Sequence, residues 1–593
     1  MREEAFYLEG GGEPMFVVHH VPGEPALERA AVLLVPPYGW EEMATHRARR
    51  EWALQLAGDG HHVLRLDLPG TGDSPGNLGD PGRWDAWLSA TQRAAVWLRA
   101  ASGASRVVAI GIGSGGYLAY NAAAAGAADD VVLWATPAHG KRFLRELKAF
   151  ARLEASRIAE SGGPPSPTTD AGIEAGGYVL PTEVASRLEE IDLESHPLRP
   201  PARVLLLDRD GSGATEALEA SLRGAGVDVE ATAGRGYAAM VVPPDLSRAP
   251  REVFALVSDW LARTGASPAT ADAPRPRDTA TSTADLGAVR EQPLAIDRDF
   301  GRLRGVLAEP VDADASPPLT LVFLNAGAIR RTGPNRLWVH AARRWAARGI
   351  PSVRIDQEGI GDSDGDGEVY QEVGRFHDPL LLEHVAAAVD HLVELGLPSR
   401  FVMVGLCAGG HWGFKLALRD ERVAAAVLVN PRILFWHEHL DPARDLRRTR
   451  LLVRPLTWKR LLRGDVPVHR WKGFAQWAAG SVAARFRRRR TELSVFDWQA
   501  EVVSEAFSEL GRVGRSAHFV FCDGEPLRDE LEVAGLLERD ERWPTVSATI
   551  VPGRDHTLKP VWMQPYAERA LDDAIRRELG RVPDSVAASS EVG

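Results

Sequence analysis

Cysteine is scarce in this sequence, which contains only Cys407 and Cys522 among its 593 residues. Two cysteines cannot form the disulfide framework of a small secreted domain, and we expect a reducing, cytoplasmic environment. The N-terminus lacks a basic segment followed by an apolar core, so no signal peptide is expected. No apolar run approaches the ~20 residues that cross a bilayer, and we therefore expect no membrane span.

Excess positive charge is also missing. The formal net charge is −11, with 45% hydrophobic and 25% charged residues. This composition is typical of a globular protein and argues against a nucleic-acid partner. A chain of this length is too long for one hydrophobic core, so at least two domains are expected.

The two halves of the chain repeat one plan. Each begins with short apolar strands that alternate with helical segments, which predicts an α/β fold with mostly parallel sheets. Matching residues keep a nearly constant separation as far as a glycine-rich turn, and the separation then increases, so extra residues in the second half follow that turn. The expected strands are 32–35, 62–66 and 107–110 in the first half and 320–324, 352–355 and 401–404 in the second.

These boundaries predict two tandem domains. We expect a first domain over 1–263 and a second over 291–581, with a cap inserted at about 432–511 before the strand that carries the acid. Residues 264–290 are rich in Ala, Pro, Thr, Ser and Asp at their start and are expected to form a flexible linker. Residues 582–593 are expected to form a frayed tail.

The most informative stretch is 401–411. Four apolar residues lead into a turn in which Gly405 and Gly409 stand two positions on either side of Cys407, and a helix can follow. This spacing is that of a nucleophile elbow, in which a strained turn leaves no space for neighbouring Cβ atoms. Cys407 is therefore the candidate nucleophile, and a buried structural cysteine is the alternative. We expect Cys522, at the end of an apolar strand, to be merely buried.

A cysteine nucleophile requires a base, and the base requires an orienting acid. His556 follows the last predicted strand, 548–551, and is the candidate base. Glu525, after the strand at 518–521, is the preferred acid, with Asp523 as the alternative and Asp555 as a weaker one. The oxyanion would be held by the backbone N–H of Ala408 and by that of Ala328 or Gly327.

Two further features, a histidine and an acidic loop, are expected to have structural and not catalytic or metal-binding roles. His411 lies one helical turn after Cys407 and is expected to pack against the sheet. Residues 362–367 resemble a calcium loop, but the twelfth position is Val373 rather than Glu, so neither a metal nor a cofactor is expected.

The cap region is strongly basic and contains several tryptophans. Its charge fits either a solvated surface or a site for an anionic partner, such as a coenzyme A phosphate or an acidic carrier protein.

The first half lacks the catalytic residues. In register, the nucleophile position is Gly113, Ser114 falls one residue late, and Tyr237 stands where His is expected. Only the acid position, Asp210, is retained, so we expect this domain to be non-catalytic. A shifted elbow that uses Ser114 with a histidine such as His139 is the alternative.

These motifs carry a family resemblance. The second half resembles the first of the two exosortase A system-associated α/β-hydrolases, which also carries Cys in the elbow, and the first half resembles the companion hydrolase. The resemblance implies a hydrolase or acyltransferase of undefined substrate, and Glu525 departs from the usual Asp. It rests on Asn325-Ala326-Gly327, Arg331, residues 333–336, 354–356 and 361–363, Gly405-Leu406-Cys407 and Asp555-His556-Thr557, and in the first half on Pro36-Pro37, residues 41–43, Arg47 and residues 67–74.

The sequence thus predicts an enzyme that acts on an ester or thioester through Cys407, His556 and Glu525 and an acyl-enzyme. Acyl transfer, cyclisation or release from a carrier by the same cysteine is the first alternative. A non-catalytic acyl-binding or scaffold protein is the second. The expected partner is a small acyl substrate, free or bound to coenzyme A or a carrier protein.

Overall fold

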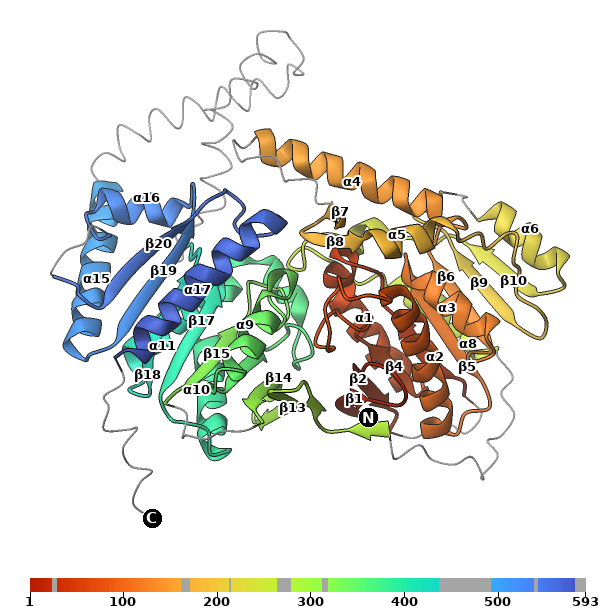
Figure 1. Cartoon of the computed structure of the whole chain (residues 1–593), viewed down its shortest axis with the longest axis horizontal. Helices are drawn as coiled ribbons and strands as arrows, with labels where there is room; N and C mark the ends of the chain where they lie inside the picture. The colour runs from red at the N-terminus through yellow and green to blue at the C-terminus, as the bar shows by residue number, and fades with distance from the viewer. Residues whose placement is uncertain are drawn as a thin grey trace, which may run out of the picture.

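The computed structural model describes residues 1–23, 29–160, 171–212, 215–263, 279–311, 318–436, 492–537 and 542–581. The chain forms two lobes, each built on its own nine-stranded, mostly parallel sheet (Figure 1). None of the helices in these ranges combines the length and apolar character needed to cross a bilayer.

The first sheet has the strand order β10-β9-β6-β5-β3-β4-β2-β1-β11. The six strands β10, β9, β6, β5, β3 and β4 run parallel, whereas β1, β2 and β11 are antiparallel additions at one edge. The strands are β1 Arg2–Leu8, β2 Met15–Val21, β3 Ala31–Val35, β4 Val63–Leu66, β5 Val107–Ile112, β6 Asp130–Trp134, β9 Arg203–Leu207, β10 Asp228–Thr232 and β11 Ala280–Thr281.

The second sheet repeats this order as β12-β13-β14-β16-β15-β17-β18-β19-β20. The predicted tandem repeat is therefore confirmed, with two domains of the α/β-hydrolase fold. The strands are β12 Ala284–Asp285, β13 Val289–Arg298, β14 Gly301–Pro310, β15 Thr320–Leu324, β16 Ser352–Asp356, β17 Phe401–Leu406, β18 Val423–Val429, β19 Ser516–Cys522 and β20 Val546–Val551.

Helices cover both faces of each sheet because the central strands are apolar on both sides. Successive residues of β3 alternate between two clusters: Leu33 packs under α2 and α3, and Leu34 packs under α1 and α8. In the second half, α10, α11, α15 and α16 cover one face, and α9 and α17 cover the other.

The main helices are α1 Trp40–Gly58, α2 Arg83–Ser102, α3 Gly115–Ala124, α4 Gly140–Glu160, α5 Thr182–Glu189, α6 Glu216–Gly224, α7 Tyr237–Met240 and α8 Arg251–Ala262, then α9 Leu337–Ala346, α10 Pro379–Glu394, α11 Ala408–Arg419, α15 Glu492–Arg512, α16 Pro526–Val533 and α17 Gln564–Leu579. Short 3-10 helices occur at Pro334–Arg336, Gly367–Gln371, Val373–His377 and Val561–Met563. A small hairpin, β7 Gly172–Ala175 and β8 Tyr178–Pro181, lies beneath α4 (Figure 1).

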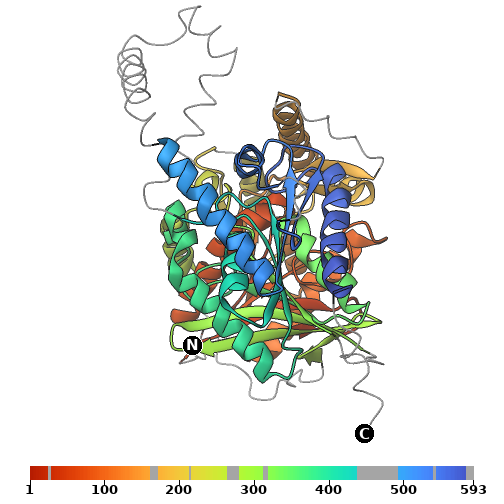
Figure 2. The ribbon, with the colours of Figure 1, turned by 90° about the vertical axis from the view of Figure 1, so that its left-hand side faces the viewer.

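The segment between the halves differs from the flexible linker expected over 264–290. Residues 264–278 lie outside the described ranges, but β11 pairs with β1 of the first sheet, and β12 pairs with β13 of the second. The long strands β13 and β14 cross the base of the second half beside β1 (Figure 2). The last part of the expected linker therefore joins the two sheets.

A buried ionic network holds the halves together. Arg331 is 1% exposed and binds Asp73 of the first half at 2.8 Å, as well as Asp356 and Asp362 of its own half. Arg330 binds Glu42 and Asp67 of the first half at 3.1 and 3.0 Å. A buried charge is tolerated only when paired, so these contacts fix how the halves meet.

The network is nearly symmetric. Arg65 of the first half binds Asp362 of the second at 2.7 Å, and the corresponding residues, Arg354 and Asp73, lie 3.3 Å apart. The two halves thus meet through matching surfaces, as the subunits of a two-fold symmetric dimer do.

Candidate active site

The Cys407 elbow joins β17 to α11. All six residues of β17 are buried, and Cys407 has φ 55° and ψ −112°, which is uncommon for a residue with a side chain. A Cβ on Gly405 would lie 2.1 Å from the carbonyl carbon of Gly409, and one on Gly409 would lie 2.3 Å from the carbonyl oxygen of Asn325. Both glycines are therefore required by close backbone packing, as the sequence pattern indicated.

His556 and Glu525 meet near the elbow. Glu525 follows β19 at the start of α16, and His556 follows β20. The Nδ1 atom of His556 lies 2.9 Å from Oε1 of Glu525, whose side chain is 6% exposed. This contact leaves Nε2 on the far side of the ring, where it has no hydrogen-bond partner among the described residues.

The alternative acids are engaged elsewhere. Asp523 lies 3.4 Å from Arg528 and is half-exposed. Asp555 accepts hydrogen bonds from the backbone N–H groups of Thr557 and Lys559, which shapes the loop that carries His556. The structure therefore places Glu525, and neither aspartate, on the imidazole.

The electrostatics of the site favour charge separation between Cys407 and His556. Burial alone would raise the pKa of the thiol, but the interaction with His556 lowers it, with smaller contributions from Arg432 and the Ala408 N–H. Burial alone would lower the pKa of His556, but Cys407 and Glu525 raise it to about 9. The pair is thus poised to hold thiolate and imidazolium together.

Asn430 supports this arrangement and was not singled out from the sequence. It directly follows β18, has φ 42° and is fully buried. Its Nδ2 donates to the carbonyl of His556 at 2.8 Å, and its Oδ1 accepts from the N–H of Cys522 at 2.8 Å. A buried polar residue at the end of an all-apolar strand was the available signal.

Cys522 is buried in the core, as expected, but it touches the acid. Its thiol donates to Oε1 of Glu525 at 3.5 Å, and burial followed by the Glu525 charge raises the pKa of the thiol. Cys522 is therefore a buried hydrogen-bond donor, and its pKa is shifted in the opposite direction to that of Cys407.

A cavity of about 350 Å³ surrounds Cys407, and both halves line it. The sequence did not predict the contribution of the first half. Met43 of α1 packs in the same apolar cluster as Leu406, and Lys559 lies 4.7 Å above the ring of Trp40. The first half provides Trp40, Met43, Pro243, Pro244 and Asp245, and the second provides residues 326–329, Val373, Phe376, His377, residues 406–408, Arg432, Ile433, residues 555–557 and Lys559.

The expected oxyanion groups lie in this cavity. Ala408 begins α11 immediately after Cys407, and Gly327 and Ala328 also line the cavity. Gly327 has φ 56°, and a Cβ there would meet no atom within 4 Å, so its conformation rather than crowding favours glycine.

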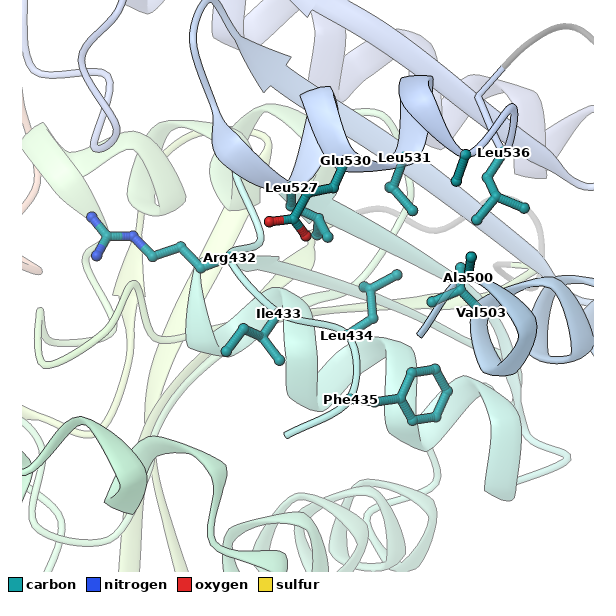
Figure 3. A pocket seen from close by; sticks show the side chains of 11 residues that line it. Arg432, Ile433, Leu434, Phe435, Ala500, Val503, Leu527, Glu530, Leu531 and Leu536 are labelled. Atoms are coloured by element: carbon teal, nitrogen blue, oxygen red, sulfur yellow. The ribbon is translucent and has the colours of Figure 1, made fainter. Parts of the chain in front are cut away.

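An apolar groove adjoins the cavity and shares Arg432 and Ile433 with it. Figure 3 shows the Arg432 side chain extending away from the leucines that line the groove, among them Leu434 and Leu531. Of the expected basic cap over 432–511, residues 437–491 lie outside the described ranges, so this prediction bears on residues that the structure does not describe.

His411 and the acidic loop have structural roles. His411 is buried, its Nδ1 lies 3.3 Å from the carbonyl of Ile433, and burial lowers its pKa to about 3. Asp362 of the calcium-like loop is bound by Arg65 and Arg331. Within the described residues, no group of three or more His, Cys, Asp or Glu side chains is placed to hold a metal ion.

The corresponding elbow of the first half carries no nucleophile. Gly113 has φ 53°, close to that of Cys407, but the Glu41 carboxylate and the Tyr237 hydroxyl stand where a side chain would be. A Cβ on Gly113 would lie 2.7 Å from Oε2 of Glu41 and 3.0 Å from the Tyr237 oxygen. Ser114 accepts a hydrogen bond from the Tyr38 N–H at 2.9 Å, and it is therefore part of the loop packing.

The other first-half candidates also have local partners. Asp210 accepts hydrogen bonds from the backbone N–H groups of Gly236, Tyr237 and Ala238. His139 lies 3.3 Å from Asp192 and 3.4 Å from Glu194, and these contacts hold it outside the elbow.

Comparisons with known proteins give matches of limited extent. A family model described as "Serine aminopeptidase, S33" matches residues 321–477. No curated protein matches the chain. Among solved structures, an esterase from an Arctic intertidal metagenomic library is similar, with 16% identity over 49% of this chain and 97% of its own, at a TM-score of 0.29.

Two other solved structures resemble the chain to the same degree. The α/β hydrolase GrgF from Penicillium sp. sh18 has 20% identity, covers 50% of this chain and 99% of its own, and gives a TM-score of 0.29. The dienelactone hydrolase from Anabaena variabilis has 14% identity, covers 49% of this chain and 98% of its own, and gives a TM-score of 0.30.

The two sheets of the chain have the same strand order, and each has a tight turn at the corresponding position, Gly113 in the first half and Cys407 in the second. The chain is a tandem pair of α/β-hydrolase-fold domains, and its second half contains Cys407, His556 and Glu525 around one cavity that both halves line.

Proposed function

We propose that the chain is an enzyme that cleaves an ester or thioester through a covalent acyl-cysteine. One observation carries the proposal: the His556 imidazole is held by Glu525 and lines the same cavity as Cys407, the central residue of a nucleophile elbow. A nucleophile, a base and an orienting acid in this order are what acyl transfer requires.

The proposed reaction has two stages. The Cys407 thiolate attacks the carbonyl carbon, and the N–H groups of Ala408 and Ala328 stabilise the resulting oxyanion. The carbon–leaving-group bond then breaks, and the leaving alkoxide or thiolate takes the proton from Nε2 of His556. In the second stage His556 accepts a proton from water, the hydroxide attacks the thioester, and the acid is released as the thiolate and imidazolium return.

The lining of the cavity favours an apolar acyl group. Met43, Phe376 and Ile433 supply apolar surface, and burying it drives binding. Arg432 and Lys559 contribute cations to the lining, and Asp245 of the first half contributes a carboxylate.

Acyl transfer to an alcohol or amine is the second candidate, which the identity of the nucleophile favours. A cysteine forms a thioester intermediate, which stays activated toward amines in a way that an oxygen ester does not. Release of an acyl group from coenzyme A or a carrier protein would use the same intermediate. The resemblance to the exosortase A system-associated hydrolases belongs to the same proposal, since that family also carries Cys in the elbow.

The direct test is intact-mass analysis of the full chain after brief incubation with p-nitrophenyl butyrate and with butyryl-coenzyme A. We expect one acyl adduct, located on Cys407 by peptide mapping, and release of butyrate over time. Adducts that persist until an amine or alcohol is added would establish transfer instead of hydrolysis.

The controls are the two cysteines. Cys407→Ala should remove the adduct and lower kcat/KM by at least ~10³-fold, because the nucleophile is lost. Cys522→Ala should retain both the acyl adduct and the wild-type kcat/KM. Acylation and turnover that persist in a folded Cys407→Ala chain would contradict the proposal, and absence of any adduct in the wild type would favour a scaffold or acyl-binding protein.

A further inference from the structure

A second cavity, of about 270 Å³, lies over the elbow of the first half and has no role in the reaction proposed for Cys407. Most of its wall is aromatic or aliphatic, and three charged side chains face it. Trp40 lines both this cavity and the Cys407 cavity, so the two are neighbours. The lining residues are Tyr38, Trp40, Glu41, Phe143, Glu146, Leu147, Phe150, Ala175, Arg209 and Val241.

Glu41 has an unusual position in this cavity. Its carboxylate occupies the space that Gly113 leaves open, and its Oε2 accepts a hydrogen bond from the Tyr237 hydroxyl at 3.0 Å. Its Oε1 lies 3.7 Å from Arg209, which is beyond hydrogen-bond distance. Oε1 is therefore an available acceptor in the lining of the cavity.

Arg209 does not neutralise this carboxylate fully, because Glu146 holds it. An Nη atom of Arg209 lies 3.1 Å from Glu146, and the guanidinium stacks over the Tyr237 ring at 4.8 Å. The second oxygen of Glu146 is taken by Arg142 at 3.1 Å. Burial, and to a smaller extent the Glu146 charge, raise the pKa of Glu41 despite Arg209 and Tyr237.

A second, independent feature is the Tyr38 hydroxyl. Tyr38 is 9% exposed and lines the cavity, and its hydroxyl has no hydrogen-bond partner among the described residues. The hydroxyl oxygen is itself almost inaccessible to solvent, so Tyr38 contributes its ring to the wall, and a ligand would reach the hydroxyl only after a small side-chain movement.

We propose that this cavity is a binding site for a small molecule with a protonated amine on an apolar or aromatic body. The ammonium would donate to Oε1 of Glu41, and the faces of Tyr38, Trp40, Phe143 and Phe150 would surround the cation and the apolar body. Aromatic faces attract cations, and a carboxylate at the base of an aromatic pocket supplies the matching charge. The retained fold of the first half thus carries a binding site in place of a catalytic one.

The test is calorimetric titration of the full chain carrying Cys407→Ala, in which acyl chemistry is absent. The probe is phenethylammonium, compared at pH 7 with 2-phenylethanol and 3-phenylpropionate, which have similar bodies and different charge. We expect phenethylammonium to bind at least ~10-fold more tightly than either analogue, the factor that one well-placed ionic hydrogen bond supplies.

Variants locate the site. Glu41→Gln keeps the shape and the acceptor for Tyr237 but removes the charge, and it should weaken phenethylammonium binding about 10-fold while leaving 2-phenylethanol unchanged. Glu189→Gln, at an exposed position on α5, is the matched control and should leave the affinity for both probes unchanged. Gly113→Ala should also weaken binding, because its methyl group would displace the Glu41 carboxylate.

Three results would overturn the proposal. The first is equal affinity for the three probes, the second is tightest binding of 3-phenylpropionate, which would make Arg209 the recognising group, and the third is phenethylammonium binding that survives Glu41→Gln. Thermal melts of each variant establish that it is folded. Because Cys407 is absent throughout, these outcomes are independent of whether the acyl-enzyme proposal holds.

Discussion

At the scale of single residues, Cys407 and Cys522 have opposite properties although both end apolar strands of one sheet. The elbow sets Cys407 against His556, which lowers the pKa of its thiol. Cys522 lies in the core against Glu525, and burial with the neighbouring carboxylate raises the pKa of its thiol. The surroundings of each sulfur, and not its residue type, shift the two thiol pKa values in opposite directions, which predicts that Cys407 is the more reactive.

This contrast predicts the pH dependence of alkylation. Iodoacetamide should modify Cys407 in the native chain with a midpoint below ~8.5, the ordinary thiol value. Glu525→Gln removes a group that raises the pKa of His556, so the imidazolium is less favoured, and the alkylation midpoint should move upward. Peptide mapping by mass spectrometry over pH 5–10 measures both midpoints.

Asp523→Asn is the matched control for that experiment, because Asp523 pairs with Arg528 instead of His556. Its alkylation profile should follow the wild type. A larger shift in Asp523→Asn than in Glu525→Gln would show that Asp523 is the acid that orients the base.

At the scale of elements, the loops after β4 and β16 are the points where the halves join. Each loop ends in a buried aspartate, Asp73 or Asp362, that is bound by arginines of the opposite half. Arg336 adds hydrogen bonds to the carbonyls of Gly70 and Ser74 in the first of these loops. Two short loops therefore hold two large sheets in one relative position.

Removing one of these aspartates should destabilise the chain strongly. Asp362→Ala leaves Arg65 buried without its carboxylate, and we expect the free energy of unfolding to fall by about 3–5 kcal/mol. Urea unfolding measured by fluorescence checks this. Glu383→Ala, in an exposed pair with Arg419, is the control and should leave the urea midpoint nearly unchanged.

The pH dependence of this contribution has a defined sign. Burial alone would raise the pKa of Asp362, but Arg65, His46 and Arg331 hold it well below its usual range. A carboxylate with a lowered folded-state pKa adds stability above its unfolded value of ~3.9 and loses it as the pH falls toward the folded value. The stability difference between wild type and Asp362→Ala should therefore be constant from pH 7 to 5 and narrow below ~3.9. A constant difference down to pH 3 would contradict this account.

At the scale of the whole molecule, the chain resembles a dimer whose two subunits are joined. One half has kept Cys407 and His556, and the other has Gly113 and Tyr237 at the corresponding positions. The first half nevertheless remains part of the Cys407 cavity through Trp40 and Met43 of α1. Its retention is therefore explained by packing and by the shape of the cavity.

This organisation predicts how a divided chain behaves. Fragments 1–270 and 271–593, cut within the segment 264–278, should copurify when coexpressed with a tag on one fragment only. The second fragment alone should precipitate or lose rapid alkylation of Cys407, because the Met43 contact and the arginine partners are missing. A monomeric second fragment with wild-type thiol reactivity would show that the first half is dispensable for the site.

The sequence by itself determined the repeated fold, the elbow and the position of His556. These features are local: apolar runs specify the strands, and glycines at Gly405 and Gly409 are required by backbone contacts a few residues away. Aligning the two halves likewise showed that Gly113 stands at the position of Cys407, so the absence of a nucleophile there required no knowledge of tertiary contacts.

Tertiary structure decided which groups surround these positions. The sequence alone left Glu525 and Asp523 both open, and only the turn into α16 places Glu525 on the imidazole. The partnership of Arg331 with Asp73 and the presence of Glu41 in the first elbow had no sequence signal. Such contacts join side chains that are tens to hundreds of residues apart, and they exist only once the chain has packed in one geometry, because no local spacing rule relates their positions.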